Sequence, residues 1–192
     1  MTILNKEFYI RNDVVEVSKD LLGKVLYTNI NGCITGGIIT ETEAYAGVHD
    51  KASHAYNALR TRRTEVMFME GGVSYVYLCY GIHHLFNVVT NQKDIPHAVL
   101  IRAIRPFDGI EEMLKRRKMV KINEKMTSGP GTVSQALGIT TSLSGTSLNS
   151  SVIWIEDRGI VVQESQIAVG IRIGVDYAEE DAFLPYRFNL ML

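Results

Sequence analysis

The sequence KVLYTNINGCITGGIITETEAY, residues 24–45, decides the fold of this chain. Residues 24–30 and 33–45 are rich in the β-branched and aromatic residues that strands favour. Between them, Asn31-Gly32 is the dipeptide preferred in a type I′ turn, because both of its residues need a positive φ. The stretch therefore predicts a β-hairpin whose second strand ends in ETEAY.

The end of this second strand carries two carboxylates and one aromatic ring. Alternate side chains of a strand lie on one face, so Glu41, Glu43 and Tyr45 are expected to project together. This face could present a carboxylate beside a flat stacking surface. The plainer alternative is a solvated strand end whose carboxylates hold Lys or Arg, and for a single Glu that is the commoner case. The residues alone leave both interpretations open.

The rest of the chain alternates further hairpin-like strands with short helices. Residues 46–63 have no sustained apolar period and predict a long loop, a feature that is often functional in a compact domain. Because strands arrive as hairpins and not as βαβ units, we predict a mixed α/β (α+β) fold with a curved, mainly antiparallel sheet, in a single domain over residues 1–192. Helices are predicted at residues 13–22, 108–118 and 128–138, and strands within residues 73–91, from His97, and at 152–157 and 167–175.

Composition excludes several classes of protein. With 46% hydrophobic and 21% charged residues, the 192-residue chain has the make-up of a globular protein and not of a disordered or fibrous one. The N-terminal MTILNKEFYI holds no long apolar run, so we expect no signal peptide, no membrane association and a cytoplasmic location, or a nuclear one in a eukaryote. Cys33 and Cys79 are too few for a disulfide scaffold or a cysteine-type zinc site.

Positive charge is concentrated in one part of the sequence. Residues 51–125 contain 13 Lys or Arg against 7 Asp or Glu, a net of +6, whereas the remainder has 7 against 14, a net of −7. A polyanion could therefore be attracted to one face and repelled by the others. From the charge alone, chance clustering of Lys and Arg on solvated loops and a helix face is the favoured explanation.

Five segments, taken together and in order, resemble the alkyladenine (3-methyladenine) DNA glycosylase family, the methylpurine-DNA glycosylase type. The resemblance covers nearly the whole chain, and the combination of ETEAY, ASHA, YVYxxYG and NVVT is highly specific. The segments are ETEAYAGVHDKASHA (41–55), RTRRTEVMF (60–68), YVYLCYGIHHLFNVVT (75–90), VLIRAIRP (99–106) and SGPGTVSQALGI (128–139).

The resemblance implies a role for each matching residue. Glu43 would be the general base that activates water, and Arg102 would hold that carboxylate and the water. The other roles are enclosure of the extruded base by Tyr45, His54 and Tyr77, entry of Tyr80 into the duplex as a wedge, and exclusion of guanine at the cavity floor by Asn87. Glu41 is the nearest rival to Glu43 as the base. The resemblance also implies a fold similar to the formyltransferase C-terminal domain.

The implied activity is base-excision DNA repair without a cofactor or a metal. A monofunctional enzyme of this kind extrudes a damaged purine from double-stranded DNA and hydrolyses its N-glycosidic bond, leaving an abasic site. Its substrates would be alkylated or deaminated purines, such as 3-methyladenine, 7-methylguanine, ethenoadenine and hypoxanthine, and we expect a monomer. Arg60 and Arg63 are candidates for phosphate contacts, whereas the SGPG turn and the Lys115–Lys118 run stay unassigned.

Two rival interpretations come from other classes. A zinc-dependent nucleobase deaminase needs an HxE motif and a later PCxxC, and the sequence contains neither. A non-catalytic nucleic-acid-binding module of the formyltransferase C-terminal type could use the same fold and basic face. Glu43, Tyr45, His54 and Asn87 argue against a passive module, because it has no need of a walled cavity.

Overall fold

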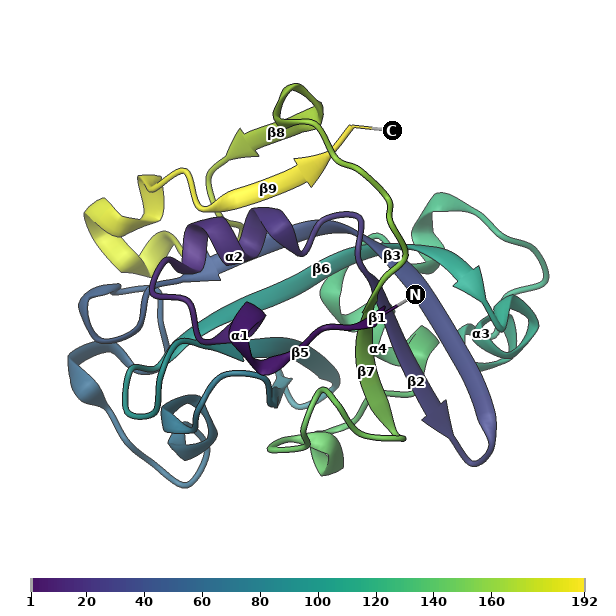
Figure 1. Cartoon of the computed structure of the whole chain (residues 1–192), viewed down its shortest axis with the longest axis horizontal. Helices are drawn as coiled ribbons and strands as arrows, with labels where there is room; N and C mark the ends of the chain where they lie inside the picture. The colour runs from purple at the N-terminus through teal and green to yellow at the C-terminus, as the bar shows by residue number, and fades with distance from the viewer. Residues whose placement is uncertain (1, 192) are drawn as a thin grey trace.

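A computed structural model describes residues 2–191 as one curved sheet with helices packed against it (Figure 1). All the strand pairings are antiparallel, and the order is β1-β7-β2-β3-β6-β5-β4, with β9 pairing to both β3 and β8. The predicted mixed α/β fold is therefore confirmed. The strands are β1 (Thr2–Ile3), β2 (Val25–Ile30), β3 (Cys33–Tyr45), β4 (Ser74–Cys79), β5 (His83–Thr90), β6 (His97–Asp108), β7 (Ile153–Asp157), β8 (Ile167–Gly170) and β9 (Arg187–Leu190).

The predicted hairpin forms β2 and β3. Ile30 pairs with Cys33 across the turn, and Asn31 and Gly32 have φ values of 54° and 79°, as a type I′ turn requires. The far end of β3 lies between β6 and β9, since Glu41 to Glu43 pairs with both strands. This end of β3, with its carboxylates, is therefore inside the sheet and not at a solvated edge.

The helices cover the sheet with apolar faces. α2 (Val14–Asp20) begins at Asp13, whose carboxylate accepts hydrogen bonds from the backbone N–H groups of Val15 and Glu16. Val17 and Leu21 are fully buried in the main core. The other helices are α1 (Lys6–Tyr9), α3 (Ile110–Arg117) and α4 (Pro130–Leu137), and α4 packs on β5 and β6. The predicted loop over residues 46–63 contains only the short 3₁₀ turns η1 (Gly47–His49) and η2 (Tyr56–Ala58).

Two predicted boundaries were wrong for physical reasons. The helix expected from residue 108 begins at Ile110, because Asp108 ends β6 and accepts a 2.7 Å hydrogen bond from the hydroxyl of Tyr27. The strand expected over residues 167–175 ends at Gly170. Residues 171–175 leave the sheet and run to the end of β3, where their polar groups have other partners.

The C-terminal region closes one end of the sheet. After residues 171–175, this region continues with η7 (Asp176–Phe183) and then β9. The sequence analysis did not predict the 3₁₀ segment η7. Other short 3₁₀ turns are η3 (Glu65–Phe68), η4 (Glu124–Met126), η5 (Thr141–Leu143) and η6 (Glu164–Gln166). Within residues 2–191, the helices are all too short or too polar to cross a membrane.

Candidate active site

One cavity of about 180 Å³ gathers residues from six parts of the chain. Its lining comes from the end of β3, the loop after it, η3, the β4–β5 hairpin, β6 and residues 173–177. Six of the residues that the resemblance singled out lie in this lining: Tyr45, His54, Tyr77, Tyr80, Asn87 and Arg102. Glu43 lies directly behind the lining, and Arg60 and Arg63 lie outside it.

Three rings form one side of the cavity, which we call the aromatic wall: His54, Tyr75 and Tyr77. The two tyrosines alternate along β4 and so share a face, with ring centroids 5.6 Å apart. The ring of His54 lies edge-on to Tyr77 at 4.6 Å, and its Nδ1 is 2.9 Å from the hydroxyl of Tyr75. The loop histidine is therefore fixed against the hairpin by both packing and a hydrogen bond.

His54 is uncharged at neutral pH. Burial, and to a smaller extent the positive charge of Arg63, lowers its pKa to about 4. Burial also raises the pKa of the Tyr75 hydroxyl to about 12, so this group keeps its proton. The aromatic wall therefore offers stacking surfaces without a net charge.

Asn87 lies on β5 beside the aromatic wall, where it pairs with Tyr75 in the ladder. Its side-chain nitrogen donates to the backbone carbonyls of Tyr75 at 3.1 Å and, more weakly, Leu85 at 3.4 Å. Two carbonyls can be satisfied only by the NH₂ group, which fixes the orientation of the amide. Its Oδ1 is then the atom able to accept a hydrogen bond from a ligand in the cavity.

Four charged side chains form a second group, which we call the ionic wall: Glu43, Asp50, Arg102 and Arg172. Of these, Arg102 lines the cavity, and the other three are buried behind its lining. Glu43 is fully buried, and its Oε1 accepts a 2.8 Å hydrogen bond from the backbone N–H of Ile173 and lies 3.3 Å from the guanidinium of Arg102. Its Oε2 accepts a 2.8 Å hydrogen bond from the hydroxyl of Tyr45. These donors make a buried negative charge tolerable.

The carboxylate of Glu43 is therefore covered by groups that themselves line the cavity. Tyr45, Arg102 and Ile173 face the space, and Glu43 lies behind them. Glu43 and Tyr45 project together as expected, since their side chains share a hydrogen bond. The carboxylate does not face the cavity, however, because the hydroxyl of Tyr45 covers Oε2. Burial and the charge of Glu43 raise the pKa of the Tyr45 hydroxyl well above its usual value, so it remains a donor.

Glu41 has a different environment from Glu43. Its Oε1 accepts hydrogen bonds from the Nε groups of Arg187 at 2.6 Å and Arg102 at 3.1 Å, and it does not line the cavity. The bulges of β3 on either side of Glu41 turn its side chain toward these arginines. Glu41 thus holds Arg102 in place against Glu43.

Tyr80 occupies the tip of the β4–β5 hairpin at the mouth of the cavity. Its side chain is 93% exposed, and the neighbouring Ile82 is 70% exposed. Tyr80 has a φ of 50° and Gly81 a φ of 74°, so the chain turns sharply at this point. Tyr80 therefore presents an exposed ring, next to the exposed Ile82, at the edge of the cavity.

The basic candidates have distinct surroundings. Arg60 pairs with Asp94 at 3.1 Å and lies over the ring of Phe68, whereas Arg63 is exposed and close enough to His54 to lower its pKa. Lys51, in the loop after β3, is paired with Glu179 and Glu180 at 2.6 and 2.7 Å.

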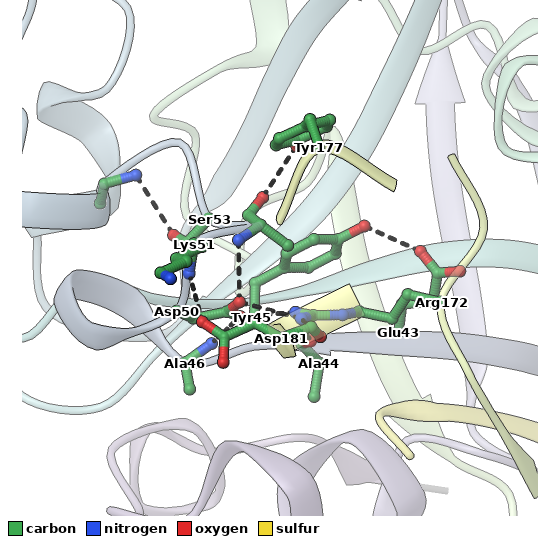
Figure 2. A network of polar contacts seen from close by, with 12 residues as sticks. Glu43, Ala44, Tyr45, Ala46, Asp50, Lys51, Ser53, Arg172, Tyr177 and Asp181 are labelled. Carbon is green, nitrogen blue, oxygen red and sulfur yellow. Dashed lines mark hydrogen bonds and ion pairs between the residues drawn. The ribbon is translucent and has the colours of Figure 1, made fainter. Parts of the chain in front are cut away.

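Three residues of the site were missed by the sequence analysis. Asp50 lay inside a matching segment without a role, and Arg172 and Ile173 lay in a predicted strand. Figure 2 shows the guanidinium of Arg172 aimed at Asp50 and the hydroxyl of Tyr45 aimed at Glu43. Among residues 2–191, no group of three or more His, Cys, Asp or Glu is placed to hold a metal ion.

Comparison with known proteins agrees with this arrangement. The sequence profile described as "Methylpurine-DNA glycosylase" matches residues 7–191. The chain belongs to the methylpurine-DNA glycosylase family. A relative from Chlamydia abortus is 47% identical over 98% of both chains, and one from Clostridium perfringens is 44% identical over 97% of this chain and 95% of its own. A third, from Bacillus cereus, is 46% identical over 94% of this chain and 92% of its own, and all three are named "Putative 3-methyladenine DNA glycosylase".

Proposed function

We propose that this protein is a monofunctional DNA glycosylase that removes alkylated or deaminated purines by hydrolysis. The observation that carries the proposal is the cavity itself, which is lined by an aromatic wall, by an exposed tyrosine and by the groups that cover a buried carboxylate. Membership of the methylpurine-DNA glycosylase family supports it. The proposed partner is double-stranded DNA with a damaged purine. The proposed location of the protein is that of the DNA, which is the nucleoid in a prokaryote and the nucleus in a eukaryote. A monomer suffices, since one chain supplies the whole cavity.

The first step is extrusion of the damaged nucleotide. A base inside a duplex cannot reach the cavity, and its unstacking costs a few kcal/mol. Tyr80 is positioned to offset this cost, because its exposed ring can fill the gap that the base leaves. The same residue lines the mouth of the cavity, so the vacated gap and the receiving cavity adjoin.

The second step is recognition of the extruded base. An N-alkylated purine is flat and often cationic, and the rings of Tyr45, Tyr77 and His54 offer stacking and cation–π attraction. Because the pKa of His54 is about 4, its ring is neutral and does not repel a cationic base. The Oδ1 of Asn87 supplies a polar contact at the side of the same space.

The third step is hydrolysis. The bond between C1′ and the purine nitrogen breaks with its electron pair leaving on the base, which turns a cationic alkylpurine into a neutral product. Water attacks C1′ and gives a proton to Glu43, whose charge also stabilises the oxocarbenium-like sugar. For this step the hydroxyl of Tyr45 must leave Oε2 so that water can take its place. A neutral base such as hypoxanthine needs an added proton, for which we assign no donor.

The test is a set of duplex oligonucleotides, each with one hypoxanthine or one 1,N6-ethenoadenine, followed by alkali cleavage. Alkylated genomic DNA, with the released bases measured, extends the test to methylated purines. We expect an abasic site from at least one of these substrates, and no covalent adduct after borohydride treatment. Binding without an abasic product from any of them would favour the non-catalytic module, and a trapped adduct would contradict the monofunctional mechanism.

A further inference from the structure

The ionic wall contains an ion pair that the proposed reaction leaves without a role. Arg172 and Asp50 are 122 residues apart in sequence, yet their side chains are 0% and 1% exposed and form a two-pronged pair. Removing two charges from water is costly unless all their polar atoms find partners. A pair of this kind beside a proposed active site therefore calls for a function.

Asp50 organises the loop that follows β3. Besides the two hydrogen bonds from Arg172, its carboxylate accepts backbone N–H groups from Ala46 at 2.9 Å and Ala52 at 3.0 Å. Ala46 follows Tyr45 directly, and Ala52 precedes His54 by two residues. The Asp50 carboxylate thus fixes the backbone between two residues of the cavity.

Arg172 contacts the end of β3 and the C-terminal segment η7. Its guanidinium donates to the backbone carbonyl of Ala44 at 3.0 Å, between Glu43 and Tyr45, and to that of Asp181 at 3.0 Å. It also lies 4.9 Å from the ring centroid of Tyr45. The cation therefore supports the face of a ring whose hydroxyl is bonded to Glu43.

The residue after Arg172 touches the carboxylate itself. Ile173 donates its backbone N–H to Oε1 of Glu43 at 2.8 Å, although residues 171–175 belong to neither a helix nor a strand. With no ladder to place Ile173, its position depends on the contacts of the adjacent Arg172. Arg172 is thus linked to both oxygens of Glu43: through the adjacent Ile173 N–H to Oε1, and through the ring of Tyr45 to Oε2.

We propose that Arg172 and Asp50 form a buried clasp that positions Glu43 and Tyr45 for the reaction. The clasp does not contact the substrate; it acts through the N–H of Ile173, the carbonyl of Ala44 and the ring of Tyr45. This inference deepens the proposed function and rests on it. Without the clasp, Glu43 loses a donor that favours its charged form, and Tyr45 loses the cation behind its ring.

The test compares Arg172→Lys and Arg172→Met with the wild-type protein. Lysine keeps the charge but cannot reproduce the planar, two-pronged contacts. We expect the single-turnover excision rate constant to fall about tenfold or more in Arg172→Lys, with the dissociation constant for lesion DNA changed less than about threefold.

A second measurement does not depend on catalysis. Hydrogen exchange of the Ile173 amide, followed by NMR with selective isoleucine labelling, is expected to accelerate about tenfold or more in Arg172→Lys. The control is Arg116→Lys, which removes a comparable set of contacts, to Glu112, Thr35 and the carbonyl of Ala136, away from the cavity. It should lower stability while leaving excision and the Ile173 amide unchanged.

The outcomes separate the two proposals. If both Arg172 variants excise lesions with the wild-type rate constant and protect the Ile173 amide as the wild-type protein does, the clasp is overturned and the proposed glycosylase function stands. A lower melting temperature alone would assign the pair a structural role only. Absence of excision by the wild-type protein on every lesion would overturn the proposed function, and the clasp would fall with it.

Discussion

The two walls of the cavity are built in different ways. The aromatic wall comes from one hairpin and a nearby loop, spans residues 54–77, and carries no net charge at neutral pH. The ionic wall joins Glu43 and Asp50 with Arg102 and with Arg172, which lies 122 residues from its partner. One wall is made by local packing, and the other by ion pairs between distant segments.

This difference separates two tasks of the site. Rings that stack on any flat base contribute to holding it, whereas the carboxylate and its donors act on the bond that breaks. Substitutions in the aromatic wall should therefore weaken binding of the extruded base, and substitutions in the ionic wall should slow hydrolysis.

The largest effect is expected for Glu43→Gln. Glutamine preserves the shape but cannot accept a proton from water, so the single-turnover rate should fall about 10³-fold, within the range for loss of a general base. Binding of lesion DNA, measured by fluorescence anisotropy, should be retained. Glu41→Gln is the matched control: it weakens the contacts of Arg187 and Arg102 with position 41 but leaves the carboxylate of Glu43 in place, so its rate should fall far less. Normal excision by Glu43→Gln would move the role of base to Glu41.

A smaller effect is expected for Tyr80→Ala, at the hairpin tip beyond both walls. Loss of a stacked ring costs about 1–3 kcal/mol, so excision from a paired lesion at low enzyme concentration should fall about 10- to 100-fold. Tyr80→Phe should retain most of the activity. When the lesion lies opposite an abasic site, it has no pairing partner and is extruded more easily. On that duplex the loss of excision in Tyr80→Ala should be smaller. An equal defect on both duplexes would contradict the wedge role.

The smallest expected effect concerns stability and His54. Its pKa is about 4 in the folded protein and about 6.5 when unfolded, so the unfolded chain binds more protons between these values. The free energy of unfolding should therefore decrease as the pH falls from 7 to 4.5, by about 2 kcal/mol from this residue. Urea unfolding at several pH values measures this decrease. The contribution of His54 to it should be absent in His54→Asn and present in the control His83→Asn, because His83 is exposed. Equal slopes in all three proteins would contradict a buried, neutral His54.

The same contrast explains what the sequence could predict. The type I′ hairpin follows from local rules of turn geometry and was predicted correctly. The shared face of Tyr75 and Tyr77 follows equally from the alternation of side chains along a strand. Residues 171–175 looked like a strand, because IRIGV has the composition of one. No local rule shows that Arg172 has a buried partner at Asp50, since that contact depends on the path of the chain after Gly170. The covering of Glu43 by Tyr45 is equally invisible in the sequence.

The central claim is that Glu43 acts on the sugar of an extruded base once Tyr45 has moved. The most direct test is a crystal structure of the wild-type protein with duplex DNA that holds a 2′-fluoro ethenoadenine nucleotide, whose glycosidic bond resists hydrolysis. We expect the base between the rings of Tyr45, His54 and Tyr77, and a water bonded to Glu43 on the C1′ side in place of the Tyr45 hydroxyl. A base seated in the cavity with Tyr45 still bonded to Glu43, and no water between that carboxylate and C1′, would contradict the account.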